Sequence, residues 1–104
     1  MKNERSVWWK SFSIHLWRTF IAIRNTDSDK WVNCEKRMIA IVEPIYNSLS
    51  DFDKQIIIQY FSACWGTDRE TVSRISAETG LSTETVWIII CKAEKAVIRS
   101  MGLI

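Results

Sequence analysis

The sequence predicts an all-α protein of four to five helices. Apolar residues make up 47% of the 104 residues and charged residues 25%, which are proportions typical of a globular domain. The chain has one proline and three glycines, so it offers little of the turn chemistry that β-hairpins need. In several segments the apolar residues recur at the spacing of one helix face. This length fits one domain, or one small domain with an added segment.

The first helix is expected over residues 6–24 and has apolar residues on two sides. One face carries Trp9, Phe12, Leu16, Phe20 and Ile23. The roughly opposite side carries Val7, Ile14, Trp17 and Ile21. A helix that is apolar on two sides needs two neighbours, and a second protomer is one candidate. The chain also has six tryptophans, more than a small core buries comfortably. We therefore expect a homodimer whose interface includes Trp8, Ile14, Trp17 and Ile21.

A second helix is expected after the turn-forming residues 25–29, and it carries a wide apolar face up to Leu49. Pro44 removes the hydrogen bond to the carbonyl of Ala40, so the segment either kinks or restarts near Glu43. Residues 1–49 are thus interpreted as an N-terminal helical pair that serves packing or dimerisation.

Residues 50–104 are expected to hold the remaining helices. Ser50 is a cap for a third helix, and Thr67 followed by Glu70 is a capping-box pattern that opens a fourth helix at about 68–79. Gly80 can take the left-handed conformation of a sharp turn, and Ser82 can cap the next helix. Two crossed helices would touch at Ile75, Leu81, Val86 and Ile89, with the small Ser76 between them. This spacing indicates a helix-turn-helix.

The same half of the chain resembles the fourth region of bacterial sigma factors. The matching residues are Leu49, Ile56, Ile75, Ser76, Gly80, Leu81, Ser82, Glu84 and Val86, continued by Lys92, Ala93 and Lys95. In size and organisation the chain is similar to short phage regulators of the ArpU type, which activate late genes. The resemblance implies a sigma-like helix-turn-helix in a transcription regulator, most simply an activator. Its partners would be double-stranded promoter DNA and RNA polymerase, in the cytoplasm of a bacterial host.

The resemblance implies that the helix after Gly80 enters the major groove, with Thr83, Glu84, Trp87, Ile88 and Cys91 near base edges. Helical spacing independently turns Glu84, Ile88, Lys92, Lys95 and Arg99 away from the apolar side. Ile88 would contact a thymine methyl and Glu84 a cytosine amine. Phosphates would be bound by Lys92, Lys95 and Arg99, and by Arg69 and Arg74. The full DNA-binding set is Arg69, Arg74, Ser82, Thr83, Glu84, Trp87, Ile88, Cys91, Lys92, Lys95 and Arg99.

Two of these positions depart from the family. Sigma factors carry arginine or glutamine where Trp87 and Ile88 stand. Trp87, Cys91 and Ile98 also form a stripe of their own, which suits packing against another helix as well as it suits a groove. A protein-only adaptor that binds RNA polymerase or another regulator is therefore an alternative, and a small terminase-like DNA-packaging subunit is another.

Other functions have little support in the sequence. Paired carboxylates, a phosphate-binding loop and a nucleophile motif are all missing, so we expect no enzyme activity and no cofactor. The three cysteines, Cys34, Cys64 and Cys91, form no CxxC pair and accompany a single histidine, His15, so no metal site is expected and buried, reduced thiols are the simplest interpretation. Lys10 and Arg18 interrupt the apolar runs of the first helix, which argues against a membrane span.

Overall fold

Five α-helices make up the fold. The structure, a computed structural model, describes residues 4–63 and 66–103, and the side chains from Trp9 onward within them. The described residues contain one short 3-10 helix besides the five α-helices, and no strand, which confirms the all-α prediction. The elements are α1 (Glu4–Ile23), η1 (Ser28–Lys30), α2 (Asn33–Ser48), α3 (Asp51–Ser62), α4 (Asp68–Thr79) and α5 (Thr83–Ser100).

The last three helices begin where their caps predict. Ser50 accepts a hydrogen bond from the amide of Asp53 at 3.1 Å. Thr67 and Glu70 form a reciprocal capping box, in which each side chain accepts from the other residue's amide. Ser82 accepts from the amide of Thr85 at 3.1 Å. Each cap satisfies an amide that the first turn of a helix leaves without a partner.

Helix α2 continues through Pro44 and does not restart at Glu43. Proline removes the amide that would bond to the carbonyl of Ala40. Both Ala40 and Pro44 are exposed, so water can satisfy that carbonyl. Buried residues lie on both sides of Pro44, namely Ile39, Val42 and Tyr46, so core packing favours one continuous helix.

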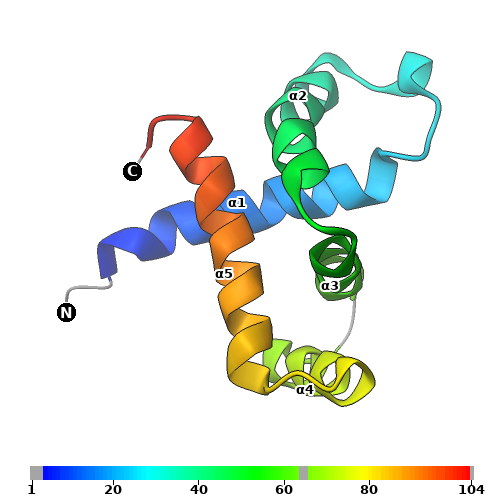
Figure 1. Cartoon of the computed structure of the whole chain (residues 1–104). Coiled ribbons are helices and arrows are strands. Elements are labelled where there is room, and N and C mark those ends of the chain that lie inside the picture. The colour runs from blue at the N-terminus through cyan, green and yellow to red at the C-terminus, as the bar shows by residue number, and fades with distance from the viewer. Residues whose placement is uncertain (1–3, 64–65, 104) are drawn as a thin grey trace.

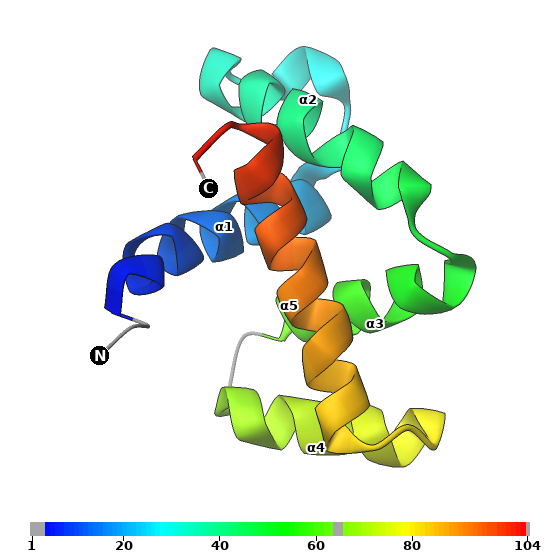
Figure 2. The same cartoon turned by 60° about the vertical axis from the view of Figure 1, so that its left-hand side comes forward.

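The core is shared by both halves of the chain, and α1 lies at its centre. Figures 1 and 2 show α1 crossing the C-terminal half of α5, while α4 lies at the other end of α5. Helices α2 and α3 both pack against α1. Trp17 is fully buried, and its ring stacks on Phe61 of α3 with the centroids 5.7 Å apart. Phe20 packs against both Trp17 and Tyr46. Residues from all five helices meet in this one cluster.

Two buried hydrogen bonds fasten α1 to α5. The indole Nε1 of Trp17 donates to the carbonyl of Ala93 at 3.0 Å. The hydroxyl of Ser13 donates to the carbonyl of Glu94 at 2.8 Å. Both carbonyls lie on the inner side of α5, so these bonds fix where α1 crosses that helix.

The position of Trp17 corrects the expected dimer interface. Its side chain has no exposed surface within its own chain, so it is not available at a surface between protomers. Helices α2, α3 and α5 of the same chain pack against α1 and cover most of its apolar residues, whereas Phe12 stays exposed. Ile14 and Ile21 are partly exposed but also pack against the core. The side chain of Trp8 lies outside the described part of the structure.

The expectation of buried cysteines is wrong for Cys34. Its thiol is exposed in the first turn of α2, and Cys91 is half-buried on α5. Cys64 lies outside the described residues. The apolar face of α2 starts one turn later than expected, which leaves Cys34 on the surface.

Candidate nucleic-acid interface

A turn of three residues, 80–82, joins α4 to α5. Gly80 has φ +80°, a conformation that costs little only for a residue without Cβ. Its amide donates to the carbonyl of Ser76 at 2.9 Å, and the hydroxyl of Ser76 in turn donates to the carbonyl of Leu81. Ile75 and Val86, on either side of the turn, are fully buried. The turn is thus fixed by backbone conformation, side-chain hydrogen bonds and packing together.

Replacing Gly80 with alanine is expected to lower the free energy of unfolding by about 1–2 kcal/mol, because an L-residue in this conformation strains the backbone. No atom lies within 4 Å of a Cβ built at this position, so strain is the whole effect. Chemical denaturation measures it. Asparagine tolerates the left-handed region better, so Gly80→Asn is the control and should cost less. Equal losses in the two variants would contradict this account of the turn.

Helix α5 is divided lengthwise into a buried and an exposed face. The inner face consists of Val86, Ile90, Ala93, Glu94, Val97 and Ile98, all buried. The outer face consists of Glu84, Thr85, Ile88, Lys92, Lys95 and Arg99, all exposed. Neighbours four residues apart lie one above the other on a helix, so the outer residues form a continuous stripe. We call it the α5 stripe.

The cations of the α5 stripe gather in its second half. Lys92, Lys95 and Arg99 follow one another at spacings of three and four residues and are all exposed. Among the described residues, their side chains form no ion pair. Their positive charge therefore faces solvent and is free to bind an anion.

The two arginines of α4 do not form a common surface. Arg69 and Arg74 are both exposed, but five residues separate them by about 140° around the helix. Arg69 also stands between Asp68 and Glu70, whose charges offset its own. One side of α4 therefore cannot present both arginines equally to one ligand.

The first turn of α5 is open to solvent, whereas the middle is partly covered. Ser82, Thr83 and Glu84 are exposed. Trp87 is half-buried, with its ring edge-on to Tyr60 at a centroid distance of 6.0 Å. Cys91 is half-buried as well. Ile98, which helical spacing places in one stripe with Trp87 and Cys91, is fully buried. Packing within the chain therefore accounts for Ile98 and for part of Trp87.

Two residues near this surface were missed in the sequence. Thr85 is exposed on the α5 stripe, and its hydroxyl lies 2.9 Å from that of Ser82. Glu94 stands between two exposed lysine positions, yet it is 1% exposed. Its Oε1 lies 3.8 Å from Nζ of Lys10 on α1. Its position four residues after Ile90 places it on the inner face, and this spacing could have identified it.

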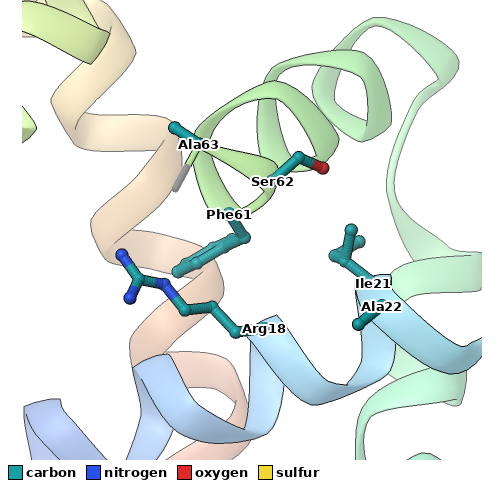
Figure 3. A pocket seen from close by; sticks show the side chains of 6 residues that line it. All are labelled: Arg18, Ile21, Ala22, Phe61, Ser62 and Ala63. Carbon is teal, nitrogen blue, oxygen red and sulfur yellow. The ribbon is translucent and has the colours of Figure 1, made fainter. Parts of the chain in front are cut away.

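A shallow hollow lies between α1 and the end of α3, away from the α5 stripe. Figure 3 shows the side chain of Arg18 reaching toward Phe61 on one side, with Ile21 and Ala22 on the other. Ser62 and Ala63 complete the lining. Ile21, which was expected in a dimer interface, therefore lines an open hollow on the surface of a single protomer.

Neither a membrane element nor a metal cluster accompanies the interface in residues 4–63 and 66–103. No helix in these ranges combines the length and the apolar character that crossing a membrane requires. No group of three or more potential metal ligands gathers there. Comparison of the chain with models of protein families, with curated proteins and with solved structures gives no match. The geometry of α4 and α5 is therefore the basis for a functional assignment.

Proposed function

We propose that this protein is a DNA-binding transcriptional regulator that acts in the bacterial cytoplasm. In this proposal α4, the turn at Gly80 and α5 form a helix-turn-helix, and the α5 stripe docks on duplex DNA. Activation, with RNA polymerase as a further partner, is the mode that the resemblance to sigma factors implies. The observation that carries the proposal is the exposed row of Lys92, Lys95 and Arg99, which form no ion pair with the described residues, on a helix whose opposite face is buried.

The arrangement of α5 supports a division of labour along the helix. Its first turn is free of α1 and carries small polar and acidic side chains, Thr83, Glu84 and Thr85, of a size that can approach base edges. Its second half carries the cations, which would bind phosphates and set the register. The helix has 18 residues, or about 27 Å at ~1.5 Å per residue. This length lets one end enter a groove while the other follows the backbone.

Replacing Lys92, Lys95 and Arg99 together with alanine is expected to weaken binding to every duplex, because phosphate contacts carry no sequence information. Each such contact contributes about 0.9 to the slope of log K against log salt concentration. Loss of three contacts should therefore reduce the magnitude of that slope by about 2.7. Fluorescence anisotropy with a labelled duplex over a salt series measures both effects.

The matched control removes the same three charges elsewhere. Lys30, Lys36 and Arg37 are two lysines and one arginine, all exposed, on η1 and α2. Their replacement with alanine lowers the net charge equally but should leave most of the salt slope in place. Equal losses in both triple variants would mean that net charge alone drives binding, and an unchanged slope in the first would remove α5 as the docking element.

A protein-only adaptor is the second candidate. It is favoured by the half-buried Trp87 and the exposed Ile88, which are apolar where a groove-binding helix usually carries polar side chains. In this case α5 would pack against a polymerase subunit or another regulator. The adaptor gives no anisotropy change with any duplex, even at low salt, so the same measurement separates the two functions.

A homodimer is a further part of the proposal. Trp17 is enclosed in its own protomer. Of the expected interface residues whose side chains the structure describes, Ile14 and Ile21 are the ones that keep exposed surface. Two-fold symmetry would require half-sites about one helical turn of DNA apart, or a multiple of it. The mass of the particle in solution decides between a monomer and a dimer.

A further inference from the structure

Ile88 is the exposed apolar residue of the α5 stripe. Its relative exposure is 54%, and the other large apolar residues of α5 are buried or half-buried. It lies one turn after Glu84 and one turn before Lys92, both exposed. An isolated apolar side chain on a surface is common, so exposure alone does not indicate a function. The position of Ile88 on the α5 stripe, between Glu84 and Lys92, is the observation that we interpret.

The packing of α5 fixes the direction of Ile88. Val86 and Ile90, two residues before and two after it, are fully buried. A residue two positions from each of them lies on the opposite side of the helix. Trp87 is held against the ring of Tyr60. Ile88 is therefore directed outward by a rigid support, and its butyl group would meet whatever the stripe binds.

The major groove of B-form DNA offers one apolar group at the base edges, the C5-methyl of thymine. RNA lacks this methyl, and the major groove of an A-form helix is too narrow for a helix to enter. An aliphatic side chain on a groove-binding surface therefore matches thymine and neither uracil nor RNA.

Glu84 adds a second base preference beside Ile88. The two residues lie about 6 Å apart along the helix axis, at ~1.5 Å per residue, which is roughly two base-pair steps of ~3.4 Å. A carboxylate repels phosphates and the acceptor atoms of guanine, but it accepts a hydrogen bond from the N4 amine of cytosine. The stripe thus combines an apolar position and an acceptor position at a spacing that DNA can match.

We propose that α5 distinguishes DNA by a thymine methyl that contacts Ile88 and by a cytosine, about two base pairs away, that faces Glu84. This inference rests on the proposed DNA-binding function and names the sequence class that the function would recognise.

The test begins with duplexes recovered by repeated selection on the protein from a random pool at low salt. The recovered sequences should share a thymine and a cytosine at that spacing. The thymine is then replaced by deoxyuridine, which removes only the methyl. Wild-type affinity should fall about fourfold, the factor that corresponds to ~0.8 kcal/mol for one buried methyl-sized group. Ile88→Ala should bind the thymine duplex more weakly and should no longer distinguish it from the deoxyuridine duplex.

The control is Val32→Ala, because Val32 is an equally exposed aliphatic residue, 58% exposed, at the N-cap of α2. It should keep the full preference for thymine. Glu84→Ala should keep that preference as well but accept other bases in place of the cytosine. The inference is overturned if wild-type protein binds both duplexes equally, or if Ile88→Ala keeps the difference. Failure to retain any duplex at low salt would overturn the proposed function itself.

Discussion

Replacing Trp17 with alanine is expected to lower the free energy of unfolding by about 3–5 kcal/mol, the usual cost of removing a buried aromatic side chain. The ring is fully enclosed, stacked on Phe61 and edge-on to Phe20. Its indole also donates to the carbonyl of Ala93 on α5. The substitution therefore leaves a cavity where α1, α3 and α5 meet and removes one of the buried hydrogen bonds that fix α1 on α5.

Two further variants separate the cavity from the hydrogen bond. Trp17→Phe keeps an aromatic ring but loses the indole donor, so it should cost less than alanine while still losing about 1 kcal/mol for the bond. Trp31→Phe is the matched control, because the Trp31 indole donates to Thr26 in an exposed hydrogen bond while its ring is half-buried and packs against the core. This variant should therefore lose less stability than Trp17→Phe. Urea denaturation gives all three values.

The same experiment tests whether Trp17 belongs to the protomer core. A core residue changes stability by an amount that does not depend on protein concentration. A residue at an obligate dimer interface gives a melting temperature that rises with concentration. Suppose that the melting temperature of the wild-type protein rises with concentration and that of Trp17→Ala does not. The stability loss would then come from a dimer interface and not from the core of one chain.

Replacing Glu94 with methionine is expected to stabilise the protein by up to about 1–4 kcal/mol near pH 8, the range found when a buried ion pair is exchanged for apolar side chains of similar volume. The partner that this variant leaves behind, Lys10, is partly exposed and can be hydrated. Glu94 is 1% exposed, and in the described part of the structure its Oε2 has no hydrogen-bond partner. Its salt-bridge partner, Lys10, is 3.8 Å away, and 45% of the lysine side chain is exposed. The attraction of Lys10 therefore repays little of the cost of burying the carboxylate.

The gain should depend on pH in a definite direction. Burial raises the pKa of the Glu94 carboxyl, Lys10 opposes the shift and the charge of Asp68 adds to it. A raised pKa in the folded state means that this group favours folding fully below its ordinary pKa of 4.5 and loses that contribution as the pH rises through the folded value. The advantage of Glu94→Met over wild type should therefore be smallest below pH 4.5 and should increase toward neutral pH.

Subtracting the free energy of unfolding of the wild type from that of the variant at each pH removes the contributions of the other carboxylates. Glu70, for example, has a lowered pKa because the backbone amide of Thr67 donates to its carboxylate, so its contribution is lost on acidification instead. Glu43→Met, at an exposed position of α2, is the control and should change stability little. A gain from Glu94→Met that stayed constant between pH 4 and pH 8 would contradict the assignment of a buried, titrating carboxyl.

Tyr60 belongs to the same buried region. Its pKa is raised above the ordinary value of 10.0, chiefly by burial and further by the charges of Asp68 and Glu94. Tyr60 therefore stays neutral at any pH at which the fold is studied. Of Tyr60 and Glu94, Glu94 is therefore the group whose protonation can change under mild conditions.

The sequence determined the helices well because their boundaries are local. The side chains of Ser50, Thr67 and Ser82 cap helices within three residues of themselves, and Gly80 forms its turn from its own backbone conformation. The α5 stripe was predictable for the same reason, since a helix turns its residues by a fixed angle. Local chemistry does not depend on how the rest of the chain packs.

Features that depend on distant partners were harder to predict. Trp17 was expected between protomers because periodicity reveals an apolar face but not the surface that covers it. The covering residues lie 44 and 76 positions away, in Phe61 and Ala93. The helical spacing of Glu94 could have placed it on the inner face, but its ionic partner Lys10 lies 84 residues earlier in the chain and could not be found from that spacing. The partial burial of Trp87 depends on its contact with the ring of Tyr60 on α3, which the sequence pattern of α5 does not reveal.

The bonds from Ser13 and Trp17 to α5 join residues 81 and 76 positions apart, and this has a consequence during synthesis on the ribosome. The nascent chain makes α1 before α5, so the carbonyls that accept hydrogen bonds from Ser13 and Trp17 are translated 81 and 76 residues later than these side chains. Contacts of such long sequence separation also form slowly, because a large loop must close before they contribute. Until then, the side of α1 that packs against α5 stays uncovered, and such transiently exposed apolar surface makes an incomplete chain a natural client for chaperones.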